Sequence, residues 1–133
     1  MVPKMRLSPL VKPIFVIGCP RSGTTLIGSC LGSHPEIGGS QESLFLGYLG
    51  RIYEDFFLGN ARHRTATLKS YVSKEILLNS LGACADDIYS SLLTKIHKIR
   101  YVDHTPWYAS WIEFINLLYP DAVFVHEIGR AHV

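Results

Sequence analysis

Six consecutive residues near the start of the chain, 20–25, have types and an order suited to holding an anion. They read Pro-Arg-Ser-Gly-Thr-Thr and lie between an apolar run, Ile14–Ile17, and a stretch predicted to be a helix over residues 26–33. The first turn of a helix offers unpaired backbone N–H groups and the positive end of the helix dipole. The loop adds four side-chain donors, those of Arg21, Ser22, Thr24 and Thr25. The pattern therefore predicts a phosphate-binding loop.

This loop differs at one position from the nucleotide-binding pattern G-x-x-x-x-G-K-[ST]. Gly18 and Gly23 have the required spacing, but Thr24 stands where the pattern has a lysine. That lysine normally reaches the β- and γ-phosphates of a nucleotide. Arg21 instead supplies a cation from within the loop, and its planar guanidinium suits two oxygens of one anionic group. We therefore expect an anion other than a magnesium-bound triphosphate, and no metal.

The segments around the loop alternate between strands and helices, which is typical of an α/β fold with a parallel sheet. Apolar runs predict strands at 14–17, 101–102 and 122–125, and a short strand that begins at Ile37. Helices are expected at 26–33, from 40–42 to 56, from 68 to a stop at Gly82, from Asp86 or Asp87 to 99, and at 107–119. Residues 59–65 are expected to form a loop. The second helix is predicted to bury one apolar stripe, composed of Leu44, Phe45, Tyr48, Leu49, Ile52 and Phe56.

The composition predicts one globular domain without a nucleic-acid partner. Of the 133 residues, 47% are hydrophobic and 18% are charged, which argues against disorder. The formal net charge is only +2, and the basic residues are scattered. The three cysteines form neither a CxxC pair nor an even set, so we expect reduced thiols and a cytoplasmic location. No apolar run approaches the ~20 residues that a membrane span requires.

Longer stretches of the sequence resemble the sulfotransferases that use 3′-phosphoadenosine 5′-phosphosulfate (PAPS) as donor. The resemblance covers residues 13–126, with motifs at 20–26 (Pro-Arg-Ser-Gly-Thr-Thr-Leu), 33–37 (Ser-His-Pro-Glu-Ile), 102–106 (Val-Asp-His-Thr-Pro) and 118–126. It implies a P-loop NTPase-like fold, in which a parallel β-sheet is flanked by helices, here incomplete at the C-terminus. It also implies transfer of a sulfuryl group to a hydroxyl or amine of a carbohydrate, peptide, lipid or small-molecule acceptor.

The resemblance gives roles to residues that match its motifs. Glu42 matches the catalytic base, which takes a proton from the acceptor during attack. The alternative is a carboxylate that only interacts favourably with a helix dipole. The 5′-phosphosulfate group of PAPS would be held by the loop residues Arg21, Ser22, Gly23, Thr24 and Thr25.

His104 departs from the family pattern, because many relatives have a lysine there that is directed at the donor. Histidine can donate a hydrogen bond or carry a positive charge, although near neutral pH it is only partly protonated. The resemblance implies a catalytic role for His104, and the alternative is a structural histidine before a helix. Trp107 and Trp111 are expected to mark a core face rather than an acceptor pocket.

The last seven residues differ from the family pattern. Relatives continue from the strand at 123–126 into an Arg-Asp segment that holds the 3′-phosphate of the donor, whereas Gly129 lies about where that arginine belongs. We do not transfer this role to Arg130. Residues 127–133 also read like a translated sequencing adapter, so we expect an irregular lead-in at 1–12, a partial sulfotransferase domain at 13–126 and a non-native tail at 127–133. The 133-residue chain is then expected to bind the donor weakly and turn over poorly, and measurable turnover would contradict this expectation.

Two other classes of function fit the phosphate-binding loop. One is a nucleotide or small-molecule kinase, which the missing lysine at Thr24 disfavours and magnesium-dependent ATP binding would favour. The other is a non-catalytic nucleotide-binding module. Replacement of Glu42 would then have no effect on transfer. Transfer that depends on Glu42 separates a sulfotransferase from both.

Overall fold

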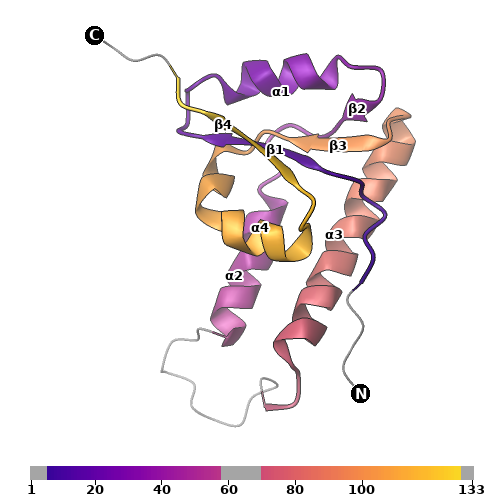
Figure 1. The fold of residues 1–133 in the computed structure, drawn as a ribbon, viewed down its shortest axis with the longest axis vertical. Coiled ribbons are helices and arrows are strands. Elements are labelled where there is room, and N and C mark those ends of the chain that lie inside the picture. Colours follow the sequence, from indigo (N-terminus) through magenta and orange to yellow (C-terminus); the bar gives the residue numbers. More distant parts are fainter. Residues whose placement is uncertain (1–5, 58–69, 130–133) are drawn as a thin grey trace.

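Four parallel strands form the centre of the fold. The computed structural model describes residues 6–57 and 70–129. The strand order is β2-β3-β1-β4, with β1 and β3 in the middle of the sheet (Figure 1). The strands are β1 (Ile14–Gly18), β2 (Ile37–Gly38), β3 (Arg100–Asp103) and β4 (Val123–Glu127). The α/β fold with a parallel sheet that the sequence predicts is confirmed.

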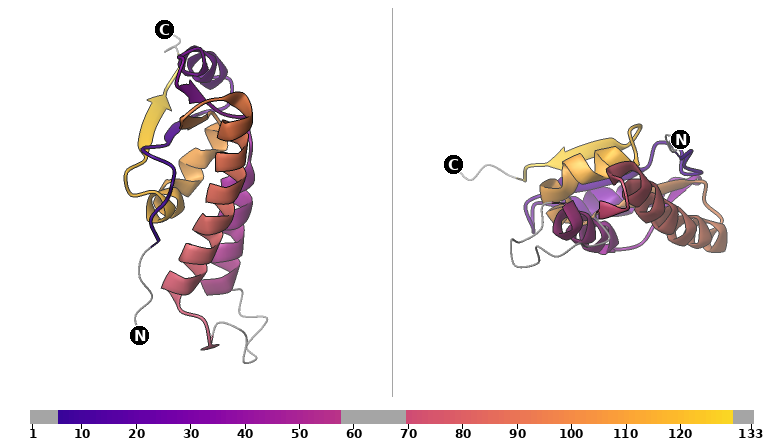
Figure 2. Two further views of the ribbon diagram at one scale, coloured as in Figure 1. Left: turned by 90° about the vertical axis from the view of Figure 1, so that its right-hand side faces the viewer. Right: turned by 90° about the horizontal axis from the view of Figure 1, so that it is seen from below.

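Helices cover both faces of this sheet. Helix α1 (Thr24–Gly32) lies on one face. The other face is covered by α2 (Phe45–Phe57), α3 (Lys74–Ile96) and α4 (Ile112–Leu118), together with a 3-10 helix, η2 (Pro106–Trp111), that leads directly into α4. Figure 1 shows α1 on one side of the strands and α2 to α4 on the opposite side, and the side view in Figure 2 shows the same separation.

The residues of β1 explain why both faces must be covered. All five residues of this strand are buried, and successive side chains of a strand point to opposite faces. Ile14 and Val16 pack toward α1, whereas Phe15 and Ile17 join the larger core under α2, α3 and α4. The four-residue apolar run therefore specifies a central strand, which fixes where the following loop begins.

Helix α3 is one continuous helix, so the predicted stop at Gly82 and the predicted cap at Asp86 or Asp87 are wrong. The helix is capped by Ser73, whose side chain accepts a hydrogen bond from the backbone N–H of Ile76. Gly82 is buried in the middle of the helix, where a Cβ atom would collide with the guanidinium of Arg6. Asp86 forms an ion pair with the same guanidinium at 3.3 Å. Both residues thus accommodate the N-terminal segment instead of ending a helix.

The face that α2 buries also differs from the predicted stripe. Leu46, Leu49 and Gly50 are buried, whereas three members of the predicted stripe, Leu44, Tyr48 and Ile52, are exposed. At Gly50 a Cβ atom would collide with the indole ring of Trp111. The side of the helix that contains Gly50 therefore faces the core, because a residue without a side chain allows the large aromatic ring of Trp111 to approach closely.

Three further predictions are corrected. The predicted helix at 107–119 is divided between η2 and α4, and Trp107 is 60% exposed, so only Trp111 of the two tryptophans packs against the core. Helix α3 ends at Ile96, so the predicted helix end at residue 99 is wrong, and Ile99 is exposed. Three parts of the sequence predictions lie outside the described residues: the loop at 59–65, Leu68 and residues 130–133. Glu127, in the predicted tail, forms the end of β4 and pairs with Gly18.

Candidate functional site

The loop between β1 and α1 has a backbone suited to an anion. Arg21 and Gly23 have positive φ angles of 64° and 108°, and the backbone N–H of Ser22 donates to the carbonyl of Cys19 at 3.2 Å. Gly23 is the N-cap of α1, with no side-chain cap and no acidic residue in the first turn of the helix. Glycine adopts the Gly23 conformation without the strain of a side chain. In the described part of the chain, neither the N-cap residue nor the first turn of α1 therefore supplies a side chain that occupies the N–H groups at the start of this helix.

The side chains of the loop differ in how they are placed. Arg21 and Thr25 are exposed, whereas Thr24 is buried. The hydroxyl oxygen of Ser22 is buried, and it has no hydrogen-bond partner among the described residues. A buried hydroxyl without a partner is costly, so such a group at a site commonly meets a ligand or water. Ser22 therefore offers a free hydroxyl from within the predicted loop.

His104 follows the end of β3 and packs against α1. The side chain is buried, with 8% exposure, and a Cβ atom at Gly28 would collide with its imidazole ring. The helix that begins at the predicted loop and the end of β3 therefore approach each other only because residue 28 has no side chain. His104 also lines a cavity of about 350 Å³ with residues of α1 and the β2–α2 loop, among them Gly28, Ser29, Ser40 and Gln41.

Glu42 lies in the loop between β2 and α2 and not in a helix. Helix α2 begins at Phe45, and its first turn contains no acidic residue, so the expected helix start at 40–42 is wrong. The interpretation of Glu42 as a carboxylate in the first helical turn loses its basis with that correction. Glu42 is exposed, and within residues 6–57 and 70–129 its side chain has no hydrogen-bond or ion-pair partner. Its carboxylate is open to a ligand.

Asp103 belongs to the motif at 102–106, but the sequence analysis gives it no role of its own. The residue ends β3 and is fully buried. Its carboxylate accepts hydrogen bonds from Ser43, Tyr101 and Thr105, with distances between 2.5 and 3.0 Å. The Asp-x-Thr spacing at 103–105 is a sequence signal for such a local turn, because an aspartate readily bonds the backbone two residues on. Ser43, which bonds Asp103 from a distant part of the sequence, cannot be recognised from the sequence as its partner.

Buried tyrosines surround this carboxylate. Burial and, to a lesser extent, the nearby charge of Asp103 raise the pKa of Tyr108 to about 12. The same two causes raise the pKa of Tyr101, and burial raises that of Tyr89, whose ring stacks on Tyr101 at 4.0 Å. These phenols therefore remain protonated at neutral pH, and those of Tyr101 and Tyr108 serve as hydrogen-bond donors within the cluster.

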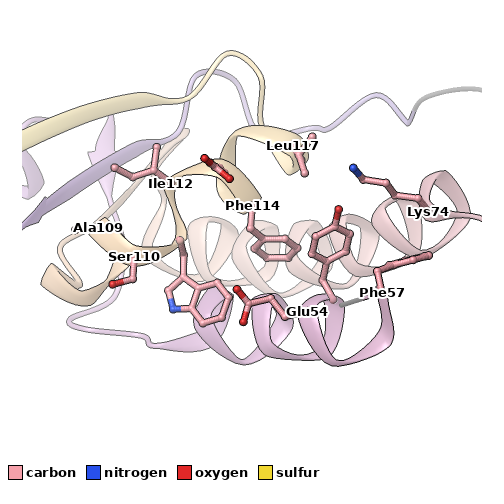
Figure 3. Close-up of a pocket in the computed structure, with 11 residues that line it drawn as sticks. Glu54, Phe57, Lys74, Ala109, Ser110, Ile112, Phe114 and Leu117 are labelled. Carbon is pink, nitrogen blue, oxygen red and sulfur yellow. The ribbon is translucent and has the colours of Figure 1, made fainter. Parts of the chain in front are cut away.

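A larger cavity, of about 640 Å³, has no residue of the β1–α1 loop in its lining, and Figure 3 shows the residues that line it. It is lined by α2, the start of α3, η2 and α4. Aromatic side chains, including Phe57, Trp111 and Phe114, line it together with the charged groups of Glu54 and Lys74. Of the two tryptophans considered for an acceptor pocket in the sequence analysis, Trp111 lines this cavity and Trp107 does not.

Among the described residues, no group of three or more His, Cys, Asp or Glu side chains is arranged to hold a metal ion. None of the helices in residues 6–57 and 70–129 combines the length and the apolar character needed to cross a membrane.

Comparison with known proteins identifies the family. The chain is 31% identical over 119 residues to Nodulation protein NoeE of Sinorhizobium fredii, a match that covers 87% of this chain and 28% of that protein. It is 30% identical over 132 residues to a putative protein-tyrosine sulfotransferase of Caenorhabditis briggsae, which covers 94% of this chain and 42% of that protein. The chain thus spans less than half the length of both relatives. Residues 13–128 match the profile of the Sulfotransferase family. The chain belongs to the sulfotransferase family.

Proposed function

We propose that the protein transfers a sulfuryl group from PAPS to a hydroxyl or amine acceptor. The observation that carries this proposal is the β1–α1 loop, which combines Arg21, a Ser22 hydroxyl without a partner among the described residues and the start of α1, and which lacks the lysine of ATP- and GTP-binding loops. Membership of the sulfotransferase family supports the reaction class. The identity of PAPS as the donor and that of a hydroxyl or amine as the acceptor are part of the proposal.

The residues of the loop fit a phosphosulfate group. Arg21 is exposed and has no hydrogen-bond or ion-pair partner among residues 6–57 and 70–129, so its guanidinium can form two parallel hydrogen bonds, and the buried hydroxyl of Ser22 needs a partner. We assign Arg21, Ser22, Gly23, Thr24 and Thr25 to this group, with the backbone N–H groups at 23–25 as donors, because the N–H of Ser22 already donates to the carbonyl of Cys19. Fixed donors directed at developing charge lower the reaction barrier, and loss of one typically costs ~3–4 kcal/mol.

Glu42 is proposed as the general base. Its carboxylate is exposed and has no protein partner among the described residues, as a base that must reach an acceptor requires. In the proposed step Glu42 takes the proton of the acceptor, and the acceptor oxygen or nitrogen forms a bond to sulfur. The bond from sulfur to the bridging oxygen breaks, and its electron pair stays on the 5′-phosphate. Arg21 neutralises that charge.

His104 is proposed to act on the donor side of the reaction. Its contact with Gly28 places the imidazole beside the helix that begins at the donor loop. From there a ring N–H can donate a hydrogen bond toward the leaving phosphate, in place of the lysine of many relatives. The name of the relative from Caenorhabditis briggsae makes a tyrosine phenol the first acceptor to test.

Replacement of one carboxylate tests the proposed base in a full-length version of the protein. Glu42→Gln should retain PAPS binding and lose transfer to a tyrosine peptide by about 100-fold or more. Glu36→Gln is the matched control, because Glu36 is also an exposed carboxylate and precedes the same loop. Unchanged transfer in Glu42→Gln would contradict the role of Glu42. Magnesium-dependent phosphoryl transfer from ATP would favour the kinase instead.

A further inference from the structure

The two residues on either side of Gln41–Glu42 are both connected to one oxygen of Asp103. The hydroxyl of Ser43 donates a hydrogen bond to Oδ2 of Asp103 at 2.5 Å. Ser40 contacts the hydroxyl of Tyr101 at 3.3 Å, and that phenol donates to the same Oδ2 at 2.9 Å. Since Tyr101 donates its only proton to the carboxylate, Ser40 is the donor in its own contact. The backbone on both sides of the exposed Glu42 is therefore anchored to the buried Asp103, directly by Ser43 and through Tyr101 by Ser40.

The other oxygen of Asp103 holds the backbone just after His104. Oδ1 accepts hydrogen bonds from the backbone N–H of Thr105 at 3.0 Å and from its hydroxyl at 2.6 Å. Asp103, His104 and Thr105 are all buried, so water competes little for these bonds. One carboxylate thus connects the segment that carries Glu42 to the segment that carries His104.

The same cluster reaches the start of α2. The hydroxyl of Tyr108 lies 2.9 Å from that of Ser43 and accepts a hydrogen bond from the backbone N–H of Leu46 at 3.0 Å. Leu44, between these two points, has a positive φ of 56°, which a leucine adopts only when its surroundings impose it. The path of the backbone from Ser40 to Leu46 is therefore set by contacts to β3 and η2.

We infer that Asp103 is a positioning residue that fixes Glu42 and His104 relative to each other. This inference rests on the proposed roles of Glu42 and His104. Hydrogen bonds to a buried carboxylate are stronger than those between neutral groups, and four of them meet at this one. Asp103 itself is fully buried and acts through its neighbours. A misplacement of reacting groups by ~1 Å can lower a rate by ~100-fold.

Local hydrogen–deuterium exchange in the full chain tests the structural half of this inference. Asp103→Asn should raise amide exchange at 40–46 and at 104–105 by at least ~10-fold, because charged hydrogen bonds are lost there. Asp86→Asn is the matched control, because Asp86 is also a buried carboxylate and bonds Ser8 and Tyr119 instead. Equal effects of the two variants on residues 40–46 would overturn the inference. If Asp103→Asn does not fold, Ser43→Ala is measured in its place.

Transfer kinetics in a full-length version test the functional half. Asp103→Asn and Ser43→Ala should lower kcat and leave the KM for PAPS nearly unchanged, and Ser43→Thr should recover part of the rate. In a Glu42→Gln background, Asp103→Asn should cause a smaller further loss than in the unmutated protein, because the part of its effect that passes through Glu42 is already lost and only the part through His104 remains. Independent, multiplying losses would overturn the positioning role. Full transfer by Glu42→Gln alone would instead contradict the proposed function, and the exchange result for Asp103 would still stand.

Discussion

Ser22 shows how a single side chain distinguishes a binding loop from an ordinary turn. Its hydroxyl is buried at the start of α1 and has no partner among the described residues. Leaving such a group unpaired costs ~1–3 kcal/mol, a penalty that a bound anion would remove. The preceding Arg21 has a positive φ, which adds strain at the same place. The unpaired hydroxyl therefore favours the ligand-bound protein over the free one, and the strained backbone at Arg21 marks the same loop as a candidate site.

Replacement of Ser22 by alanine should therefore have opposite effects on stability and on binding. Ser22→Ala removes an unpaired buried hydroxyl, so the free energy of unfolding should stay the same or rise by up to ~1 kcal/mol. The affinity for PAPS should fall by ~10-fold, since one hydrogen bond to a charged group is lost. Urea unfolding and calorimetric titration measure the two effects.

Ser91→Ala serves as the control for this substitution, because Ser91 is exposed on α3. It should leave PAPS affinity unchanged. A Ser22→Ala variant that is less stable but binds PAPS normally would show that the hydroxyl is structural.

At the scale of elements, the parts that depend on neighbouring residues could be predicted from the sequence. The apolar run of β1 and the glycines of the following loop are such local signals, and both are confirmed. The continuity of α3 could not be predicted, because Gly82 and Asp86 have the types of residues that end or begin helices. Their actual partner, Arg6, is more than seventy residues away. The buried face of α2 likewise depends on Trp111, which belongs to η2.

The contact between α1 and His104 gives a prediction at this scale. Gly28→Ala should lower the free energy of unfolding by ~1–3 kcal/mol, although alanine favours a helix by ~1 kcal/mol, because the new methyl group collides with the imidazole and its Cβ. Gly32→Ala is the control, since nothing lies within 4 Å of the added atom. It should be neutral or stabilising. Urea unfolding measures both, and a stabilised Gly28→Ala would contradict the packing of His104 on α1.

In the whole molecule, the candidate site is assembled at the ends of the central strands. Arg21 to Thr25 follow β1, and His104 follows β3. The loop could be predicted because its chemistry lies in consecutive residues. Asp103 could not, since its role depends on Ser40 and Ser43, about sixty residues earlier in the chain. Two buried carboxylates thus join distant segments through hydrogen bonds, Asp86 to Tyr119 and Asp103 to Ser43.

These tyrosines give the molecule a defined response to alkaline pH. Burial raises the pKa of Tyr108 from 10.0 to about 12, and it raises the pKa of Tyr89, Tyr101 and Tyr119 as well. The folded state therefore favours the protonated phenols. Their contribution to stability is fully present below pH ~10 and is lost as the pH rises above it, by up to ~1.4 kcal/mol per pH unit for each tyrosine.

Phenolate absorbance and far-UV circular dichroism, recorded together, check this response. Of the seven tyrosines, the four buried ones should ionise only as the helical signal is lost. The chain unfolded in urea, where all seven are exposed, provides the reference amplitude. Full ionisation of all seven tyrosines in a chain that keeps its helical signal would contradict the burial of this cluster.

The most direct test of the central claim is calorimetric binding of PAPS to a full-length version of the protein and to its Arg21→Ala variant. We predict that PAPS binds without magnesium, that Arg21→Ala weakens this binding by at least ~10-fold, and that ATP with magnesium does not compete. Binding of ATP that requires magnesium, is tighter than that of PAPS and is insensitive to Arg21 would contradict the assignment of this loop to a phosphosulfate donor.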